Sequence, residues 1–242
     1  MLLLIRLPIA LITFIGVSGI GAFVFLFRPF NPDNTRLAAR SFSWLGCKIL
    51  GIKVKIQGSE LCKDMPPSVV VANHQNNLDL VICGAVIPKR TVSVGKRSLL
   101  LLPGFGLIYW LAGNVLIDRS SKKSATSTID ATTEALTKGN RSIWMFAEGT
   151  RNQGKNILPF KKGAFRMAIE AGVPIVPICI QSYSGKLSLN KINSGTVNIK
   201  VLEPIPTTGM TLDDTNRLMN ECWQKMKSTL DLLDRDQLEQ AS

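Results

Sequence analysis

The sequence predicts an α/β protein: a central mixed sheet flanked by helices, preceded by an N-terminal two-helix membrane-anchoring segment. From residue 52 onward, short runs rich in β-branched residues alternate with stretches of helical periodicity, a pattern typical of a sheet covered by helices. Near the N-terminus, 21 consecutive residues carry no charge. A chain of 242 residues holds one large domain with little left for a second. We therefore expect membrane-embedding helices over residues 1–50 and one α/β domain over residues 51–242.

The uncharged run extends from Leu7 to Phe27. As a helix it is long enough to cross a bilayer core of about 30 Å. A cleaved signal peptide is the competing interpretation, but only Arg6 precedes the run as a positive charge, and no small-x-small cleavage site follows it. A cluster of small residues could kink the segment or let another helix approach closely: Gly16, Ser18, Gly19 and Gly21. An embedded or re-entrant segment is therefore an alternative to a full span.

The stretch over residues 34–50 has the periodicity of an amphipathic helix. Arg36, Arg40 and Ser43 lie on one side of this helix. The opposite side carries an apolar stripe of four residues: Ala38, Phe42, Leu45 and Ile49. A helix packed on the core fits this pattern, and so does a helix in the membrane interface with its basic face toward the headgroups. The arginines that follow the uncharged run place the next domain in the cytoplasm.

Seven short runs are expected to be strands: 54–56, 69–71, 92–94, 115–117, 143–146, 175–180 and 197–202. Helices are expected in parts of 79–87, 98–111, 124–138, 161–171 and 211–235. Pro174 and Pro177 argue against residues 175–180 forming an ordinary central strand, because proline cannot donate to a ladder. The apolar stretch over 99–111, interrupted at Pro103 and Gly104, fits either core packing or a second membrane-contacting patch that could line a groove for a lipid tail.

Composition narrows the class of partner. Lys and Arg number 29 against 17 Asp and Glu, a formal net charge of +12, which suits a nucleic acid, an anionic membrane surface or a phosphorylated substrate. The positive mean hydropathy favours the membrane, and no RNA-binding signature is present, so no nucleic acid partner is expected. Five scattered cysteines without a C-x-x-C pair indicate reduced thiols. With a single histidine, no metal site is expected.

That histidine, His74, directly follows the β-rich run 68–72, and Asp79 lies five residues further on. Strand ends in α/β proteins are where ligand sites gather. Five residues correspond to about 140° on a regular helix, so the two side chains can meet only if His74 lies in the loop before the helix. The Asp79 carboxylate can then accept from one ring nitrogen and leave the other as a base. The alternative is a polar turn residue that bonds to a backbone carbonyl.

A second polar group follows the run 143–146, where Glu148, Gly149, Thr150 and Arg151 come in succession. A carboxylate, a glycine and an arginine at the end of a buried strand are positioned for a polar ligand. The Arg151 guanidinium suits phosphate, because it donates a bidentate fork. Glu148 could hold Arg151 or a hydroxyl. A solvated basic surface is the alternative, since five basic residues and no acid occur over residues 151–166.

These segments together resemble the glycerophospholipid acyltransferase family, and most closely the bacterial 1-acylglycerol-3-phosphate acyltransferases, which make phosphatidic acid. The resemblance covers residues 69–180. It is carried by four segments in order: His74-x4-Asp79, 113–119, 146–151 and 173–177. Gly95-Lys96 and residues 159–165 also match. Where the family usually has F-P-E-G-T-R, this chain has Ala147 in place of the proline. Without a fixed φ before Glu148, the loop is expected to be less rigid.

The resemblance implies an acyltransferase domain over residues 51–242, with no cofactor and with acyl-CoA or an acyl carrier protein thioester as co-substrate. His74 would be the general base and Asp79 would fix its tautomer. Lys96 and Arg151 would hold the phosphate of lysophosphatidic acid, while Glu148, Gly149 and Thr150 shape the acceptor site.

The implied location is the bacterial inner membrane, with the catalytic domain facing the cytoplasm and contacting anionic lipids. The alternatives are an acyltransferase for another lysophospholipid or for glycerol-3-phosphate, a non-catalytic membrane lipid-binding protein, and a lipase or thioesterase. A lipase of the G-x-S-x-G type is disfavoured, because the chain contains no such motif.

Overall fold

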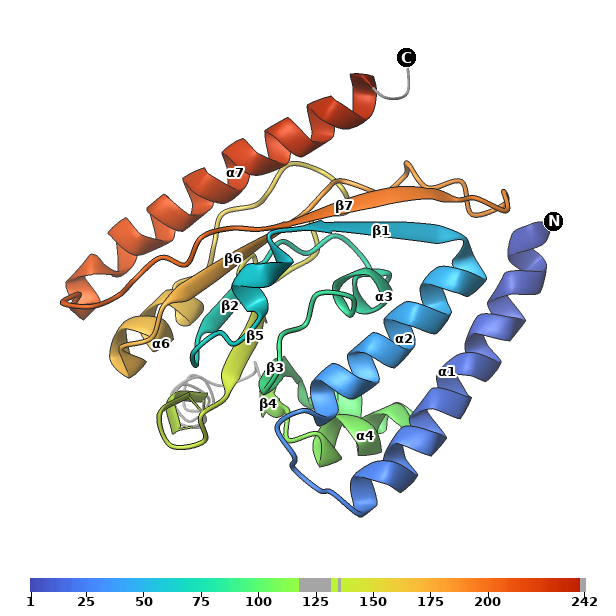
Figure 1. Cartoon of the computed structure of the whole chain (residues 1–242), viewed down its shortest axis with the longest axis horizontal. Coiled ribbons are helices and arrows are strands. Elements are labelled where there is room, and N and C mark those ends of the chain that lie inside the picture. The colour runs from blue at the N-terminus through green and yellow to red at the C-terminus, as the bar shows by residue number, and fades with distance from the viewer. Residues whose placement is uncertain (118–131, 135, 240–242) are drawn as a thin grey trace.

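In the computed structural model, which describes residues 1–117, 132–134 and 136–239, a twisted sheet runs through the molecule with helices on both faces (Figure 1). The strand order is β1-β7-β6-β2-β5-β3-β4. The strands are β1 (Ile52–Gln57), β2 (Val69–Ala72), β3 (Thr91–Lys96), β4 (Val115–Ile117), β5 (Ser142–Phe146), β6 (Ile175–Ile180) and β7 (Gly195–Val201). All neighbours are parallel except β6 and β7, which are antiparallel. The predicted mixed sheet is therefore confirmed.

Parallel pairing in the centre of the sheet decides where the polar segments meet. Ala72 at the end of β2 pairs with Phe146 at the end of β5 and with Ile178 in β6. The chain after β2 and the chain after β5 therefore leave the sheet side by side at its carboxyl edge. This register explains how segments more than 70 residues apart can build one site.

The two faces of the sheet bury separate apolar layers. On one face lie α6 (Gly163–Ala171) and α7 (Thr215–Glu239), which cover Val69, Val71 and Ile143. On the other face lie α2 (Asn34–Leu50) and α3 (Asp79–Cys83), which pack against Val70 and Ala72. Consecutive residues of β2 thus point to opposite layers, as the two-residue period of a strand requires, and all four are fully buried.

A third apolar cluster joins the N-terminal helices to the domain. Helix α1 (Leu2–Leu26) packs beside α2 and α4 (Phe105–Leu111), with Phe25, Phe42, Phe105 and Ile108 among the buried residues between them (Figure 1). Most of the remaining α1 surface is apolar and exposed. In the described part of the chain, α1 is the one helix whose length and composition would let it span a membrane. This helix suits the chain to membrane association.

The N-terminal end of α1 is fixed by a buried arginine. Arg6 is 6% exposed, and its guanidinium donates hydrogen bonds to three carbonyls and one hydroxyl of the loop before β7: Leu189 O, Lys191 O, Ile192 O and Ser194 Oγ, at 2.7–3.0 Å. A guanidinium on a helix this apolar would be costly in lipid without partners. The loop carbonyls provide them and hold α1 against the domain.

The seven expected strands are all present, whereas several helices differ from expectation. The stretch 79–87 is helical only over α3, and 98–111 divides at Pro103-Gly104 into a 3₁₀ turn, η2 (Arg97–Leu101), and α4. Helix α2 packs between α1, α3 and the sheet, the core-packed alternative, and Ser43 is buried rather than facing out. Whether α2 also contacts lipid stays a prediction. Asp118, Arg119 and most of the helix expected over 124–138 lie outside the described residues.

The two prolines predicted that residues 175–180 would not form an ordinary central strand, and β6 is central but irregular. Strand β6 lies between β2 and β7, with Pro177 opposite Val71. The ladder with β7 covers only residues 178–180, and pairing resumes at Ile175 with Ile205. The offset between these two pairings is a bulge of one residue. Pro177 lies at this bulge, where its missing N–H interrupts no regular ladder bond.

Candidate active site

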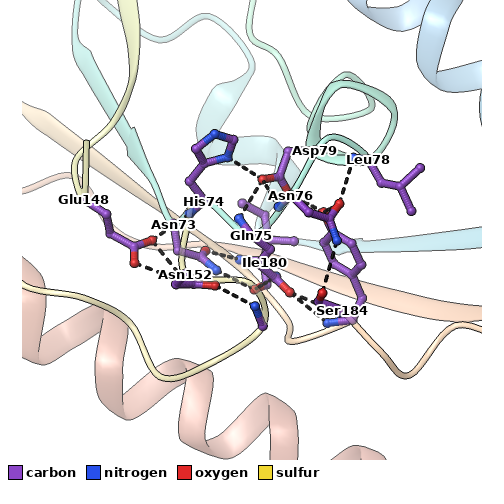
Figure 2. A network of polar contacts seen from close by, with 12 residues as sticks. Asn73, His74, Gln75, Asn76, Leu78, Asp79, Glu148, Asn152, Ile180 and Ser184 are labelled. Carbon is purple, nitrogen blue, oxygen red and sulfur yellow. Dashed lines mark hydrogen bonds and ion pairs between the residues drawn. The ribbon is translucent and has the colours of Figure 1, made fainter. Parts of the chain in front are cut away.

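The loop after β2 is held to the sheet by side chains that replace missing backbone pairs. Asn73 accepts a hydrogen bond from the Ile180 N–H at 2.8 Å and donates one to the Ile180 carbonyl at 2.9 Å. It thereby continues the β2–β6 pairing one step beyond the strand. On the other side, the Asn152 N–H donates to the His74 carbonyl at 2.8 Å. The backbone at His74 is therefore held by β6 on one side and by the loop after β5 on the other (Figure 2).

His74 lies in the loop and Asp79 begins α3, the arrangement that the five-residue spacing requires. The distance from His74 Nδ1 to Asp79 Oδ2 is 2.5 Å. Asp79 is 2% exposed and His74 is 20% exposed. The imidazole stacks on Phe146, with ring centroids 4.0 Å apart and planes inclined by 13°. With Nδ1 turned to the carboxylate, Nε2 has no hydrogen-bond partner among the described residues, and it is the nitrogen left to act as a base.

Asp79 is surrounded by donors. Besides the imidazole, Oδ2 accepts hydrogen bonds from the backbone N–H groups of Gln75, at 2.7 Å, and Asn76, at 3.2 Å. The other oxygen, Oδ1, accepts from the phenol of Tyr183 at 2.6 Å. These donors hold the Asp79 carboxylate in a fixed position beside the imidazole.

Glu148 is the second buried carboxylate next to His74, on the opposite side from Asp79 (Figure 2). It is 1% exposed and accepts from the His74 N–H at 2.7 Å, the Leu158 N–H at 2.8 Å and the Asn152 side-chain amide at 3.1 Å. Burial raises the pKa of this carboxyl, and these hydrogen bonds oppose the rise. Its contacts fasten the two loops together, so Glu148 acts on the site through the His74 backbone.

Of the remaining predicted residues, Arg151 lines the cavity beside His74, whereas Lys96, Gly149 and Thr150 do not. Arg151 is exposed and lines the same cavity as His74. Lys96 is exposed at the end of β3, and Thr150 is exposed beside Arg151. Gly149 adopts a φ of +69°, where a side chain would be strained, and an added Cβ would lie 3.1 Å from Lys161 Cγ. Glycine therefore permits the turn that carries the chain from buried Glu148 to exposed Arg151.

The imidazole opens into a cavity of about 480 Å³, a size typical of ligand sites. His74, Asn76, Asn77, Asp79 and Arg151 form a polar part of its wall. Most of the rest is apolar and comes from α1, α2, α3, β3, η2, α4, β5 and the connections between them: Phe14, Ala38, Ala39, Phe42, Leu80, Cys83, Ile87, Val94, Leu99, Leu102, Phe105, Ile108, Ala112, Trp144 and Phe146. The geometry suits a ligand with a polar reacting end and a long apolar part.

Sequence reasoning missed the residues that support this pair. Gln75 donates to the carbonyls of Ile180 and Gln181 and accepts from the Tyr183 N–H. Asn152 donates to Glu148, and Tyr183 donates to Asp79. The polar run Asn73-His74-Gln75-Asn76-Asn77 was the only available signal for Gln75. Nothing in the chain near Tyr183 pointed to Asp79. Among the described residues, no three His, Cys, Asp or Glu side chains gather closely enough to hold a metal ion.

Comparison with known proteins agrees with this geometry. The family model described as "Acyltransferase" matches residues 53–181. The chain is 39% identical to the 1-acyl-sn-glycerol-3-phosphate acyltransferases of Salmonella typhimurium and Escherichia coli K12, over 98% of this chain and 96% of each relative. It is 38% identical to that of Haemophilus influenzae, over 98% of both chains.

A solved structure shares the fold. The crystal structure of the 1-acyl-sn-glycerophosphate (LPA) acyltransferase PlsC from Thermotoga maritima matches with a TM-score of 0.73 over 96% of this chain and 98% of that one, at 21% identity. The family model covers the strands and loops that carry His74, Asp79 and Glu148, and the bacterial relatives align over nearly the whole length. This chain belongs to the acyltransferase family.

Proposed function

We propose that this acyltransferase moves a fatty acyl group from a thioester to the sn-2 hydroxyl of 1-acylglycerol-3-phosphate, giving phosphatidic acid. The observation that carries the proposal is the His74–Asp79 pair, with Nδ1 and Oδ2 2.5 Å apart, in the wall of a largely apolar cavity that Arg151 also lines. The names of the bacterial relatives support the same acceptor.

In the proposed reaction His74 is the general base. Its Nε2 removes the proton of the acceptor hydroxyl while the hydroxyl oxygen attacks the thioester carbonyl, and positioned bases of this kind contribute about 10²–10⁴-fold to the rate. The carbon–oxygen bond forms and the carbon–sulfur bond breaks. The imidazolium then returns its proton to the leaving thiolate sulfur. Asp79 holds the Nδ1–H and stabilises the imidazolium, so no acyl-enzyme is needed.

The phosphate of the acceptor would bind at the basic rim. Arg151 is the cation of the cavity wall and can offer two parallel N–H donors to a phosphate. Lys96, exposed at the end of β3, is assigned to the same phosphate, and Gly149 and Thr150 shape the turn beneath it. Glu148 contributes to the acceptor site by fixing this loop against His74.

The apolar wall of the cavity is assigned to an acyl chain, and the co-substrate is acyl-CoA or an acyl carrier protein thioester, with no cofactor. We place the protein at the bacterial inner membrane through α1, with the domain on the cytoplasmic side and anionic lipids as neighbours. Apolar side chains of η2 and α4, the latter in contact with α1, are also exposed and would form the second membrane contact: Leu100, Leu101, Leu102, Leu107 and Trp110.

The test is an acceptor panel with purified full-length enzyme in lipid nanodiscs and a radiolabelled acyl donor. Acceptors are 1-acylglycerol-3-phosphate, glycerol-3-phosphate and lysophosphatidylcholine, with the His74→Ala variant as control. We expect phosphatidic acid from the first acceptor, at a rate far above the others and far above the control. A preference for another acceptor would overturn the substrate assignment. Free fatty acid released without acceptor would indicate a lipase or thioesterase, and lipid binding without any transfer would remove the catalytic assignment.

A further inference from the structure

Tyr183 lies behind the catalytic pair and outside the cavity. It belongs to the loop after β6 and is 2% exposed, in the apolar layer between the sheet and α2 and α3. Its hydroxyl is 2.6 Å from Asp79 Oδ1 and 3.1 Å from Asn76 Oδ1. A phenol has one proton to donate, and a charged carboxylate at the shorter distance is the stronger acceptor. The proton therefore lies toward Asp79.

The two oxygens of Asp79 accept hydrogen bonds from different groups. Oδ2 receives the imidazole and two backbone N–H groups, whereas Tyr183 is the donor that the described residues offer to Oδ1. A carboxylate held by donors on both oxygens cannot rotate about its Cβ–Cγ bond without breaking one set. Tyr183 thus restricts rotation of the Asp79 carboxylate, the group that orients His74.

The phenol is itself kept protonated and in place. Burial, and next the neighbouring Asp79 carboxylate, raise the pKa of Tyr183 far above its ordinary value, so the hydroxyl stays a donor at any working pH. Its backbone N–H donates to Gln75 Oε1 at 2.9 Å. One residue earlier, Ser182 donates from both its N–H and its hydroxyl to Asp234 in α7. The loop that carries the phenol is therefore anchored to the C-terminal helix.

We infer that Tyr183 is a positioning residue for acyl transfer: it holds the Asp79 carboxylate in the rotation that keeps His74 Nε2 directed into the cavity. This inference rests on the proposed role of the His74–Asp79 pair. Tyr183 does not line the cavity, and its shorter hydrogen bond goes to Asp79, at 2.6 Å, rather than to Asn76 of the cavity wall, at 3.1 Å. Its main effect therefore reaches the substrate through that pair. Its removal should therefore alter turnover more than acceptor binding.

The experiment uses Tyr183→Phe, which removes one oxygen and keeps the ring that fills the core. In full-length enzyme in nanodiscs we expect kcat to fall about tenfold to a hundredfold, the range for a lost hydrogen bond to a charged group, while the KM for lysophosphatidate stays within about twofold. A change in KM alone, or a kcat equal to wild type, would overturn the inference. His74→Ala is assayed in parallel: if it retains activity, the proposed function fails, whereas a dead His74→Ala beside a normal Tyr183→Phe refutes this inference alone.

A spectroscopic measurement separates positioning from simple destabilisation. The chain has one histidine and two tyrosines, so histidine-selective ¹⁵N labelling gives the imidazole signals of His74 alone. We expect Tyr183→Phe to move the Nδ1–H resonance or broaden it by exchange with water. The matched control is Tyr109→Phe, which also loses a buried hydroxyl, one bonded to Ser93, and should leave that resonance in place. A lower kcat with an unchanged His74 resonance in Tyr183→Phe would assign the residue a structural role only.

Discussion

The loops that follow β2 and β5 each place a buried carboxylate beside His74, and the two carboxylates do different work. Asp79, from the β2 loop, receives the imidazole itself at 2.5 Å. Glu148, from the β5 loop, receives the backbone N–H of the same residue at 2.7 Å. One carboxylate sets the tautomer and direction of the ring, and the other sets where the ring is attached. Proximity of an acid to a catalytic base therefore does not reveal its role; the donor that it accepts from does.

The largest expected effect comes from removing the ring. His74→Ala should lower kcat by about 10²–10⁴-fold, because no other described side chain could take over as the base at this position. The backbone N–H that binds Glu148 remains, so the fold should persist. Radiometric acyl transfer measures the rate, and thermal unfolding in detergent checks folding. A folded variant with a rate near wild type would remove the general-base assignment.

Replacing the carboxylate that orients the ring should have the next largest effect. Asp79→Asn is nearly isosteric but offers one oxygen and one NH₂ group where Oδ1 and Oδ2 accept four hydrogen bonds. We expect kcat to fall about a hundredfold as the favoured tautomer is lost. The ¹⁵N signals of Nδ1 and Nε2 of His74, the one histidine of the chain, should report the tautomer change. Retention of the wild-type tautomer together with a normal rate would contradict the comparison of the two carboxylates.

Beyond Glu148, the β5 loop ends in an exposed cation that should affect binding more than turnover. Arg151→Ala should raise the KM for lysophosphatidate about tenfold, because a bidentate donor to phosphate is lost. The KM for the acyl donor should change little. Lys155→Ala is the matched control, because it removes an exposed cation from the same segment at a position that does not line the cavity. Equal increases in both KM values for Arg151→Ala would argue against phosphate binding there.

The smallest expected effect is on stability, and it tests the structural role of Glu148. Burial raises the pKa of this carboxyl above its ordinary value of 4.5. A carboxyl with a raised folded-state pKa stabilises the fold fully below its unfolded pKa and loses that contribution as the pH rises through the folded value. Wild type should therefore lose stability relative to Glu148→Gln, which cannot ionise, as the pH rises from below 4.5 to neutrality.

Unfolding temperatures of both proteins across this range measure the change. For a chain of this size about 1 kcal/mol corresponds to about 2–4 °C, and we expect a relative shift of this order. The test is how the difference in unfolding temperature changes with pH, not its size at one pH. The glutamine NH₂ group leaves one backbone or side-chain donor without an acceptor at every pH, which adds a constant difference. A constant difference between the two proteins, or one that changes in the opposite direction, would show that burial does not dominate at Glu148.

Much of the fold was accessible from local pattern. β-Branched runs are short-range signals, and all seven predicted strands formed. The break at Pro103-Gly104 followed from proline chemistry. Pro174 and Pro177 predicted that β6 would not be an ordinary central strand, but they did not give its place in the sheet. Only the path of residues 201–205 creates the bulge that tolerates Pro177 between two neighbouring strands. A bulge depends on the partner strand, which the local sequence does not specify.

For the site, the sequence by itself determined that His74 and Asp79 could meet. One histidine, at the end of a β-branched run and five residues before an aspartate, left few geometries in which the two could meet, and the fold supplied the expected one. Only the tertiary structure decided that Glu148 binds the His74 backbone and that Tyr183, more than 100 residues along the chain, completes the shell of Asp79. The reason is physical: hydrogen bonds between segments depend on strand order and register, which are set by packing of the whole sheet rather than by neighbouring residues.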